Sequence, residues 1–185
     1  MEEGDPVRLF TALWPTPEAD AALTAALAAS PPWHPDGEWR PVPPERRHVT
    51  LCFHGLDRIG PRARALDDAL AGTPLPRLRL AGLGTFPGVL WAGVRDDPPG
   101  ALARLAVAAG ADPAGFRAHL TLARRARGAR GRPEFAEGAA LPAGPWWRPG
   151  AVLLVRSDLG PAGPDHTPVH RVSPGPSTRR RLGER

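Results

Sequence analysis

Apolar and polar side chains alternate along this chain in short runs that proline and glycine separate. A period of two predicts β-strands, because successive side chains of a strand point to opposite faces of its sheet. Alternation predicts strands at residues 7–13, 39–40, 48–53, 77–80, 89–94, 119–123 and 169–172. The run 151–155 is apolar throughout and predicts a buried strand, and Gly55 is expected to close the strand at 48–53.

Three other segments are rich in alanine and leucine and predict helices at residues 18–29, 61–71 and 99–109. The first follows Pro17 and ends before Pro31, and the third stops at Gly110, as helices commonly begin and end. Strands interleaved with helices indicate a layered α/β or α+β fold. We expect one domain over residues 1–172 and a basic, disordered tail over residues 173–185.

One strand-like tetrapeptide occurs twice, as His48-Val49-Thr50-Leu51 and as His119-Leu120-Thr121-Leu122. In a strand, residues i and i+2 point to one face, so each histidine shares a face with its threonine. Two such strands side by side would present two imidazoles and two hydroxyls to one cleft. That set offers two proton-transfer groups and two neutral hydrogen-bond donors, and it needs no metal ligand.

Composition narrows the class of protein. The chain has 185 residues, 42% of them hydrophobic, and no apolar run approaches the ~20 residues of a membrane-spanning helix. Cys52 is the only cysteine, which excludes a disulfide framework and favours a cytoplasmic protein. All 24 basic residues are arginine, and the net charge is +5. This arginine bias resembles a genome-wide preference, so the charge supports an anionic partner only weakly.

Around the two tetrapeptides the sequence resembles one family in detail. The segments 8–13, 39–51, 84–94, 116–124 and 157–159 are similar to those of the RNA 2′,3′-cyclic phosphodiesterases, also called 2′-5′ RNA ligases, of the two-histidine (2H) phosphoesterase superfamily. The resemblance covers about residues 7–172. It departs from the family at Ala118, where proline is common, at His54, where an aliphatic residue is common, and near His166, where a tyrosine is usual.

The resemblance implies an α+β fold with two lobes of antiparallel sheet, flanked by helices and related by a pseudo-twofold axis, with a cleft between them. It implies that His48 donates a proton to the leaving 3′ oxygen and that His119 is the base, which leaves a 2′-phosphate. Thr50 and Thr121 would stabilise the charge on the non-bridging oxygens. We expect no metal, no cofactor and no membrane partner, and a monomer. Run backwards, the same site would perform 2′-5′ ligation.

Two other functions remain open from the sequence. One is a 2H phosphodiesterase that acts on small cyclic nucleotides or on ADP-ribose cyclic phosphate. The other is a nucleotide- or RNA-binding module on the same fold that performs no turnover. The presence of both histidines and both threonines favours an enzyme.

Residues outside the tetrapeptides give weaker signals. Arg124 is a candidate phosphate contact, although strict alternation would place it on the face opposite His119 unless the strand twists or ends there. Phe86, together with Trp91, is a candidate for stacking on bases, with core packing as the alternative. The remaining histidines are interpreted as incidental: His34, His54, His166 and His170.

Overall fold

The computed structural model describes residues 4–29, 31–32, 38–126, 140–160 and 163–172. The tail that the sequence predicts at 173–185 lies outside these residues, as does His34. Among the described residues, no helix is long and apolar enough to cross a membrane.

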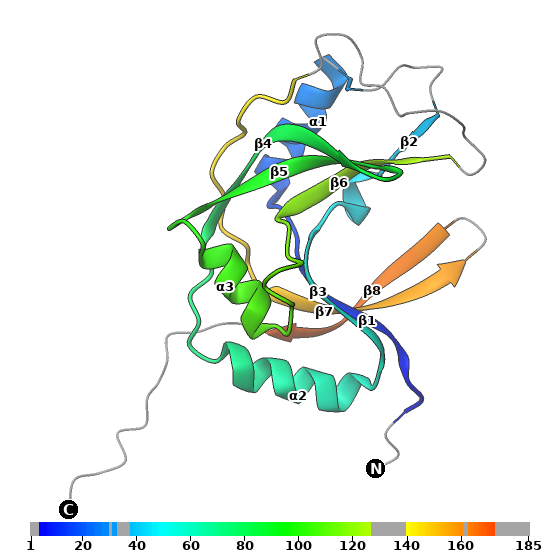
Figure 1. The fold of residues 1–185 in the computed structure, drawn as a ribbon, viewed down its shortest axis with the longest axis vertical. Helices are drawn as coiled ribbons and strands as arrows, with labels where there is room; N and C mark the ends of the chain where they lie inside the picture. Colours follow the sequence, from blue (N-terminus) through cyan, green and yellow to red (C-terminus); the bar gives the residue numbers. More distant parts are fainter. Residues whose placement is uncertain (1–3, 30, 33–37, 127–139, 161–162, 173–185) are drawn as a thin grey trace, which may run out of the picture.

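Within the described part of the chain, eight strands form one antiparallel sheet with the order β4-β5-β6-β3-β1-β7-β8, and β2 pairs with β6 (Figure 1). The strands are β1 (Val7–Leu13), β2 (Trp39–Pro41), β3 (Val49–Asp57), β4 (Arg77–Phe86), β5 (Val89–Asp97), β6 (His119–Arg125), β7 (Val152–Gly160) and β8 (Gly163–Val172). The α+β prediction is therefore confirmed.

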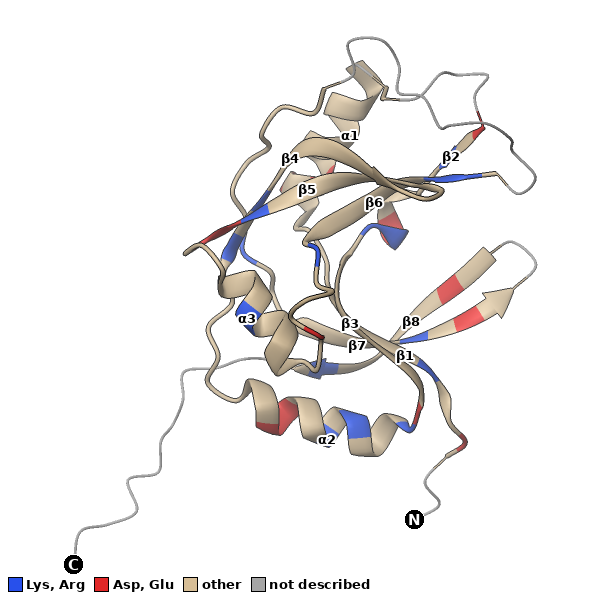
Figure 2. Ribbon diagram, in the orientation of Figure 1, with Lys and Arg blue, Asp and Glu red and all other residues tan. Residues whose placement is uncertain are grey.

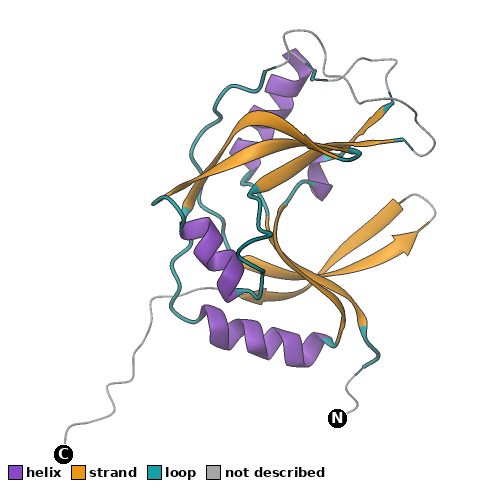
Figure 3. Cartoon of the chain, viewed as in Figure 1, coloured by secondary structure: helices purple, strands orange, loops and turns teal. Residues whose placement is uncertain are grey.

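The sheet divides into two lobes where β3 meets β6. One lobe contains β2, β4, β5 and β6, and the other contains β1, β3, β7 and β8, and the two groups of strands splay apart (Figure 3). The junction is a single backbone pair, Val49 opposite Leu120. These residues occupy the same position in the two tetrapeptides, so the antiparallel pair creates a local twofold relation between the lobes, as predicted.

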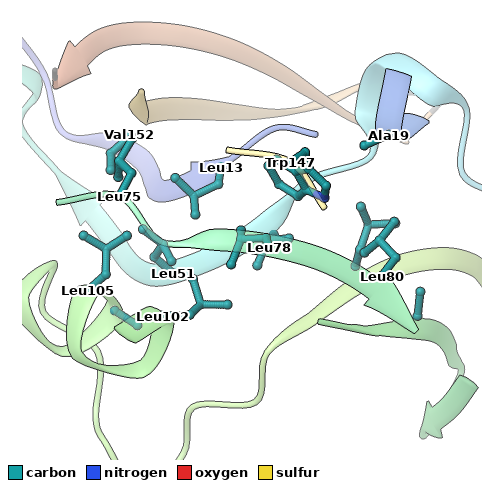
Figure 4. Close-up of a cluster of buried hydrophobic side chains, with 14 of the residues drawn as sticks. Leu13, Ala19, Leu51, Leu75, Leu78, Leu80, Leu102, Leu105, Trp147 and Val152 are labelled. Atoms are coloured by element: carbon teal, nitrogen blue, oxygen red, sulfur yellow. The ribbon is translucent and has the colours of Figure 1, made fainter. Parts of the chain in front are cut away.

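Three helices cover the sheet: α1 (Pro17–Ala29), α2 (Ile59–Leu70) and α3 (Ala101–Ala108). Helix α1 buries Ala19, Leu23 and Leu27, whose spacing of four residues places them on one stripe. Figure 1 shows α1 against the lobe that contains β4 and β5, and α2 and α3 at the other lobe. The buried side chains form one large cluster shared by both lobes, part of which is drawn in Figure 4.

Several strands are longer than the alternation predicts, and the prediction that Gly55 closes its strand is wrong. Gly55 lies inside β3 with a φ of 69°, a conformation that glycine adopts without strain. The strand continues to Asp57, which pairs with Val7 of β1. Likewise β4 runs on to Phe86 and β8 begins at Gly163. Hydrogen bonds to a neighbouring strand, rather than side-chain alternation, decide where these strands end.

A buried arginine ties the segment before β3 to helix α1. Arg47 is 7% exposed. Its Nη1 donates to Asp20 Oδ1 at 3.1 Å and to Thr24 Oγ1 at 2.7 Å, and its Nε donates to the Val42 carbonyl at 3.2 Å. Because Arg47 directly precedes the first motif histidine, this network holds the entry to the motif strand in place.

We expect Arg47→Ala to lower the free energy of unfolding by about 2 kcal/mol or more, because it leaves the Asp20 carboxylate and a buried carbonyl without their donor. Urea unfolding would measure the change. The control is Arg156→Ala, which breaks an ion pair whose side chains are 41% and 52% exposed, and it should cost less than about 1 kcal/mol. Equal losses in the two variants would contradict a structural role for Arg47.

Candidate active site

The backbone pair that joins the lobes lies at the centre of both tetrapeptides. Continuing its antiparallel register by one residue in each direction sets His48 beside Thr121 and Thr50 beside His119. All four side chains are half-buried. Thr50 and His119 also line one cavity, although they belong to different lobes. The fold thus gathers the four predicted residues around one cleft.

Both motif histidines are held in the same tautomer. His48 Nδ1 lies 2.7 Å from the carbonyl oxygen of Arg46, and His119 Nδ1 lies 2.7 Å from the carbonyl oxygen of Arg117. A carbonyl only accepts hydrogen bonds, so Nδ1 carries the proton and donates in each ring. The other ring nitrogen, Nε2, is therefore the one left to exchange protons in the cleft.

Aromatic rings fix the orientation of both imidazoles. Trp14 stacks on His48 with ring centroids 5.0 Å apart, and Phe10 packs beside it at 5.1 Å. Phe86 meets His119 edge to face at 5.0 Å, and it also contacts Trp91 at 5.2 Å. Phe86 is half-buried, so it lies beside the candidate catalytic ring with part of its surface still accessible.

Arg124 lies on the same side as the histidines because of a β-bulge. Thr121 and Ala123 pair with consecutive residues of β5, which leaves Leu122 as an extra residue in β6. The bulge resets the alternation, so Leu122 and Ala123 are both buried and Arg124 is exposed. Alternation alone would have placed Arg124 opposite His119. Within the described residues Arg124 forms no ion pair, and it belongs to the basic end of β6, blue in Figure 2.

The comparisons with known proteins agree with this geometry. No family model matches the chain. A curated protein of Thermus thermophilus named RNA 2′,3′-cyclic phosphodiesterase is 32% identical over 187 residues, covering 90% of each chain. This chain belongs to the RNA 2′,3′-cyclic phosphodiesterase family of 2H phosphoesterases.

Solved structures carry the same fold. TT0787 of Thermus thermophilus is 31% identical with a TM-score of 0.69, over 90% of this chain and 97% of that one. Escherichia coli LigT complexed with phosphate is 25% identical with a TM-score of 0.65, over 92% of this chain and 98% of that one. The family resemblance predicted from the tetrapeptides is therefore confirmed.

In this family member the cleft itself keeps His48 neutral. Burial lowers the pKa of His48 to about 4, against the opposing effect of the hydrogen bond to the Arg46 carbonyl, and the charges of His166, Arg124 and His119 lower it further. The ring is thus uncharged at pH 7 when the cleft is empty. A phosphodiester bound beside it would bring a negative charge, and a nearby anion raises an imidazole pKa.

His166 is a residue at the cleft that the sequence interpretation set aside as incidental. Its ring meets His48 edge to face at 5.1 Å and Phe10 at 5.0 Å. Burial lowers its pKa, and the charges of Arg46 and Arg124 act in the same direction. The available signal was its place in the resemblance, where the family usually has a tyrosine.

Two other histidines have structural partners away from the motif residues. His54 Nε2 lies 2.7 Å from the hydroxyl of Thr11, which is fully buried. His170 Nε2 lies 2.9 Å from Asp67 Oδ1, where β8 packs against α2. Cys52 is buried, as expected for a structural thiol. Among the residues that the structure describes, no group of three or more histidine, cysteine, aspartate or glutamate side chains could hold a metal.

The lowered histidine pKa values predict loss of stability in mild acid. Burial lowers the pKa of His54 to about 4, as it does for His48, whereas both would titrate near 6.5 in the unfolded chain. Below ~6.5 the unfolded state binds more protons, so the free energy of unfolding should fall as the pH drops from about 6.5 toward 4. His54→Gln should reduce the difference between urea unfolding at about pH 7 and about pH 4.5. An unchanged difference would contradict a depressed pKa at His54.

Proposed function

We propose that this chain is a metal-independent enzyme that hydrolyses 2′,3′-cyclic phosphate ends of RNA to 2′-phosphates. The observation that carries the proposal is the matched pair of imidazoles, each with Nδ1–H bonded to a carbonyl two residues earlier and Nε2 left for proton transfer. Two proton-transfer groups on two sides of one phosphorus are what the opening of a cyclic phosphodiester requires. The Thermus relative is named for this activity, and LigT was crystallised with phosphate.

In the proposed reaction His119 Nε2 takes a proton from water as the water oxygen attacks phosphorus. The bond between phosphorus and the 3′ oxygen breaks, and His48 Nε2–H gives its proton to that oxygen. The products are a 3′-hydroxyl and a 2′-phosphate. His48 needs a proton before this step, and the charge of the bound phosphodiester favours it by raising the pKa of the ring.

The transition state spreads negative charge over the non-bridging oxygens. The hydroxyls of Thr50 and Thr121 are neutral donors held by the two motif strands, so they can stabilise this charge without reorganising. The guanidinium of Arg124 adds a cation and several N–H donors on the same side. Phe86, which packs against His119, is positioned to support that ring or to meet the ribose of the substrate.

All the proposed groups come from one chain, which supports the prediction of a monomer. The continuous sheet supports a single domain over residues 1–172. An RNA substrate is consistent with the expected cytoplasmic location. Reversal of the reaction, with a 5′-hydroxyl in place of water, would give 2′-5′ ligation at the same site. Small cyclic phosphates remain the alternative substrates, because the motif residues contact only the phosphate.

We expect His48→Ala and His119→Ala each to lower kcat by at least ~10²-fold, the low end for removal of one general acid or base. The assay follows an oligonucleotide with a 2′,3′-cyclic phosphate end, in EDTA, and identifies the product end. His170→Gln, at a histidine outside the cleft, is the control. Wild-type rates in both alanine variants, or activity that needs a divalent ion, would contradict the proposal.

His166 is expected to act by positioning His48, because the two rings are in edge-to-face contact. His166→Phe keeps an aromatic ring there and should retain most of kcat, whereas His166→Ala should lower kcat by about tenfold, since a displaced catalytic ring loses its alignment. The pH profile of kcat/KM separates the roles. If His166 itself transfers a proton, the phenylalanine variant will lose as much activity as the alanine variant.

A further inference from the structure

A cavity of about 290 Å³ opens directly beside the motif residues. One wall is the stretch of β3 from Thr50 to Phe53, and His119 borders it from the other lobe. The opposite wall is the loop between α3 and β6, which contributes Gly110–Asp112 and Gly115–Arg117. The volume is close to the lower end of small-molecule sites, ~300 Å³, which suits one small flat group rather than a large ligand.

Phe53 is an exposed aromatic ring at this cavity. Thr50 and Cys52 pair with consecutive residues of β1, which leaves Leu51 as an extra residue in β3. This bulge occupies the same place in the first tetrapeptide as the bulge that turns Arg124 toward the histidines. It buries Leu51 and Cys52 and leaves Phe53 76% exposed. Its one ring contact in the described residues is with Phe10, at 6.1 Å.

Asp112 places a carboxylate on the opposite wall. Its Oδ1 accepts the backbone N–H of Ala114 at 3.0 Å, and its carbonyl accepts the N–H groups of Gly115 and Phe116. These bonds shape the loop and orient the aspartate. Within the described residues Oδ2 accepts no hydrogen bond, so the cavity combines an open aromatic face with an available acceptor.

We propose that this cavity binds the nucleobase of the nucleotide that carries the cyclic phosphate, with Phe53 stacked on the base and Asp112 accepting hydrogen bonds from its edge. The inference rests on the proposed function, because the phosphate between the histidines is what brings the base to this cavity. Aromatic side chains commonly bind unstacked RNA bases in this way.

The carboxylate predicts which base is preferred. Guanine presents two adjacent donors, N1–H and the N2 amino group, which match the acceptor-only oxygens of an aspartate. Uracil presents one N–H between two carbonyl oxygens, and these would face the negative charge. The site therefore favours guanine and disfavours uracil. Leu51, Cys52 and Phe116 supply the apolar part of the lining.

The test compares 2′,3′-cyclic GMP, 2′,3′-cyclic UMP and base-free ribose 2′,3′-cyclic phosphate. Phe53→Ala should raise KM for cyclic GMP roughly 5- to 150-fold, the range for one stacked base, and Phe53→Trp should restore it. The base-free substrate should be turned over equally by wild type and by all variants. Leu56→Ala is the matched control, because Leu56 is 70% exposed on the same strand but does not line the cavity.

Asp112→Asn tests the edge contact, since asparagine keeps an oxygen for the Ala114 N–H. Wild type should prefer cyclic GMP over cyclic UMP by about tenfold or more in kcat/KM, and Asp112→Asn should bring the ratio near one. A guanine preference that survives in this variant would overturn the role of Asp112. A Phe53→Ala enzyme that behaves like Leu56→Ala would overturn the subsite.

Titration with guanosine 2′-monophosphate and with ribose 5-phosphate separates the subsite from the catalytic proposal. The wild-type protein should bind the guanosine compound more tightly, and Phe53→Ala should remove the difference. If no cyclic phosphate is turned over but this difference holds, the proposed reaction fails and the base site stands. If turnover holds and the difference is absent, the base site is wrong.

Discussion

The candidate site depends on one backbone contact, the antiparallel pairing of Val49 with Leu120. Without it the two lobes would be separate sheets, and each would carry half of a catalytic set. The pair joins equivalent positions of the two tetrapeptides, so one local twofold relation brings two histidines and two threonines together. The fully buried Val49 and Leu120 side chains anchor this crossing in the core, which makes the spacing of the imidazoles a property of the sheet rather than of loops.

The two bulges extend that symmetry and then give the lobes different chemistry. Each motif strand carries one extra residue directly after its threonine, and each bulge turns the next outward side chain toward the cleft. In β6 that side chain is Arg124, a cation suited to phosphate. In β3 it is Phe53, an aromatic ring suited to a base. One repeated backbone device therefore supplies two kinds of contact, which matches a substrate that has a charged end and an aromatic end.

The surroundings of the histidines favour a cleft that is uncharged until substrate arrives. Carbonyl acceptors fix the Nδ1–H tautomer in both rings, aromatic neighbours restrict their rotation, and burial lowers the pKa of His48 to about 4. A neutral imidazole packs against Trp14 and Phe10 without the cost of burying an ion. The anion that binds can then supply the field that brings a proton to His48, so protonation is coupled to the presence of a phosphodiester.

The sequence by itself determined the strands and helices, the family and the four motif residues, because alternation, helix boundaries and a repeated tetrapeptide are local patterns. It did not place Arg124, Phe53 or His166. The first two depend on bulges, which appear only when a strand is paired with its neighbour and one strand has a residue more. His166 meets His48 because β8 folds back across the lobe, and that contact joins residues far apart in the chain. Tertiary structure decided these positions, since pairing register and strand crossing are set by the packing of the whole sheet.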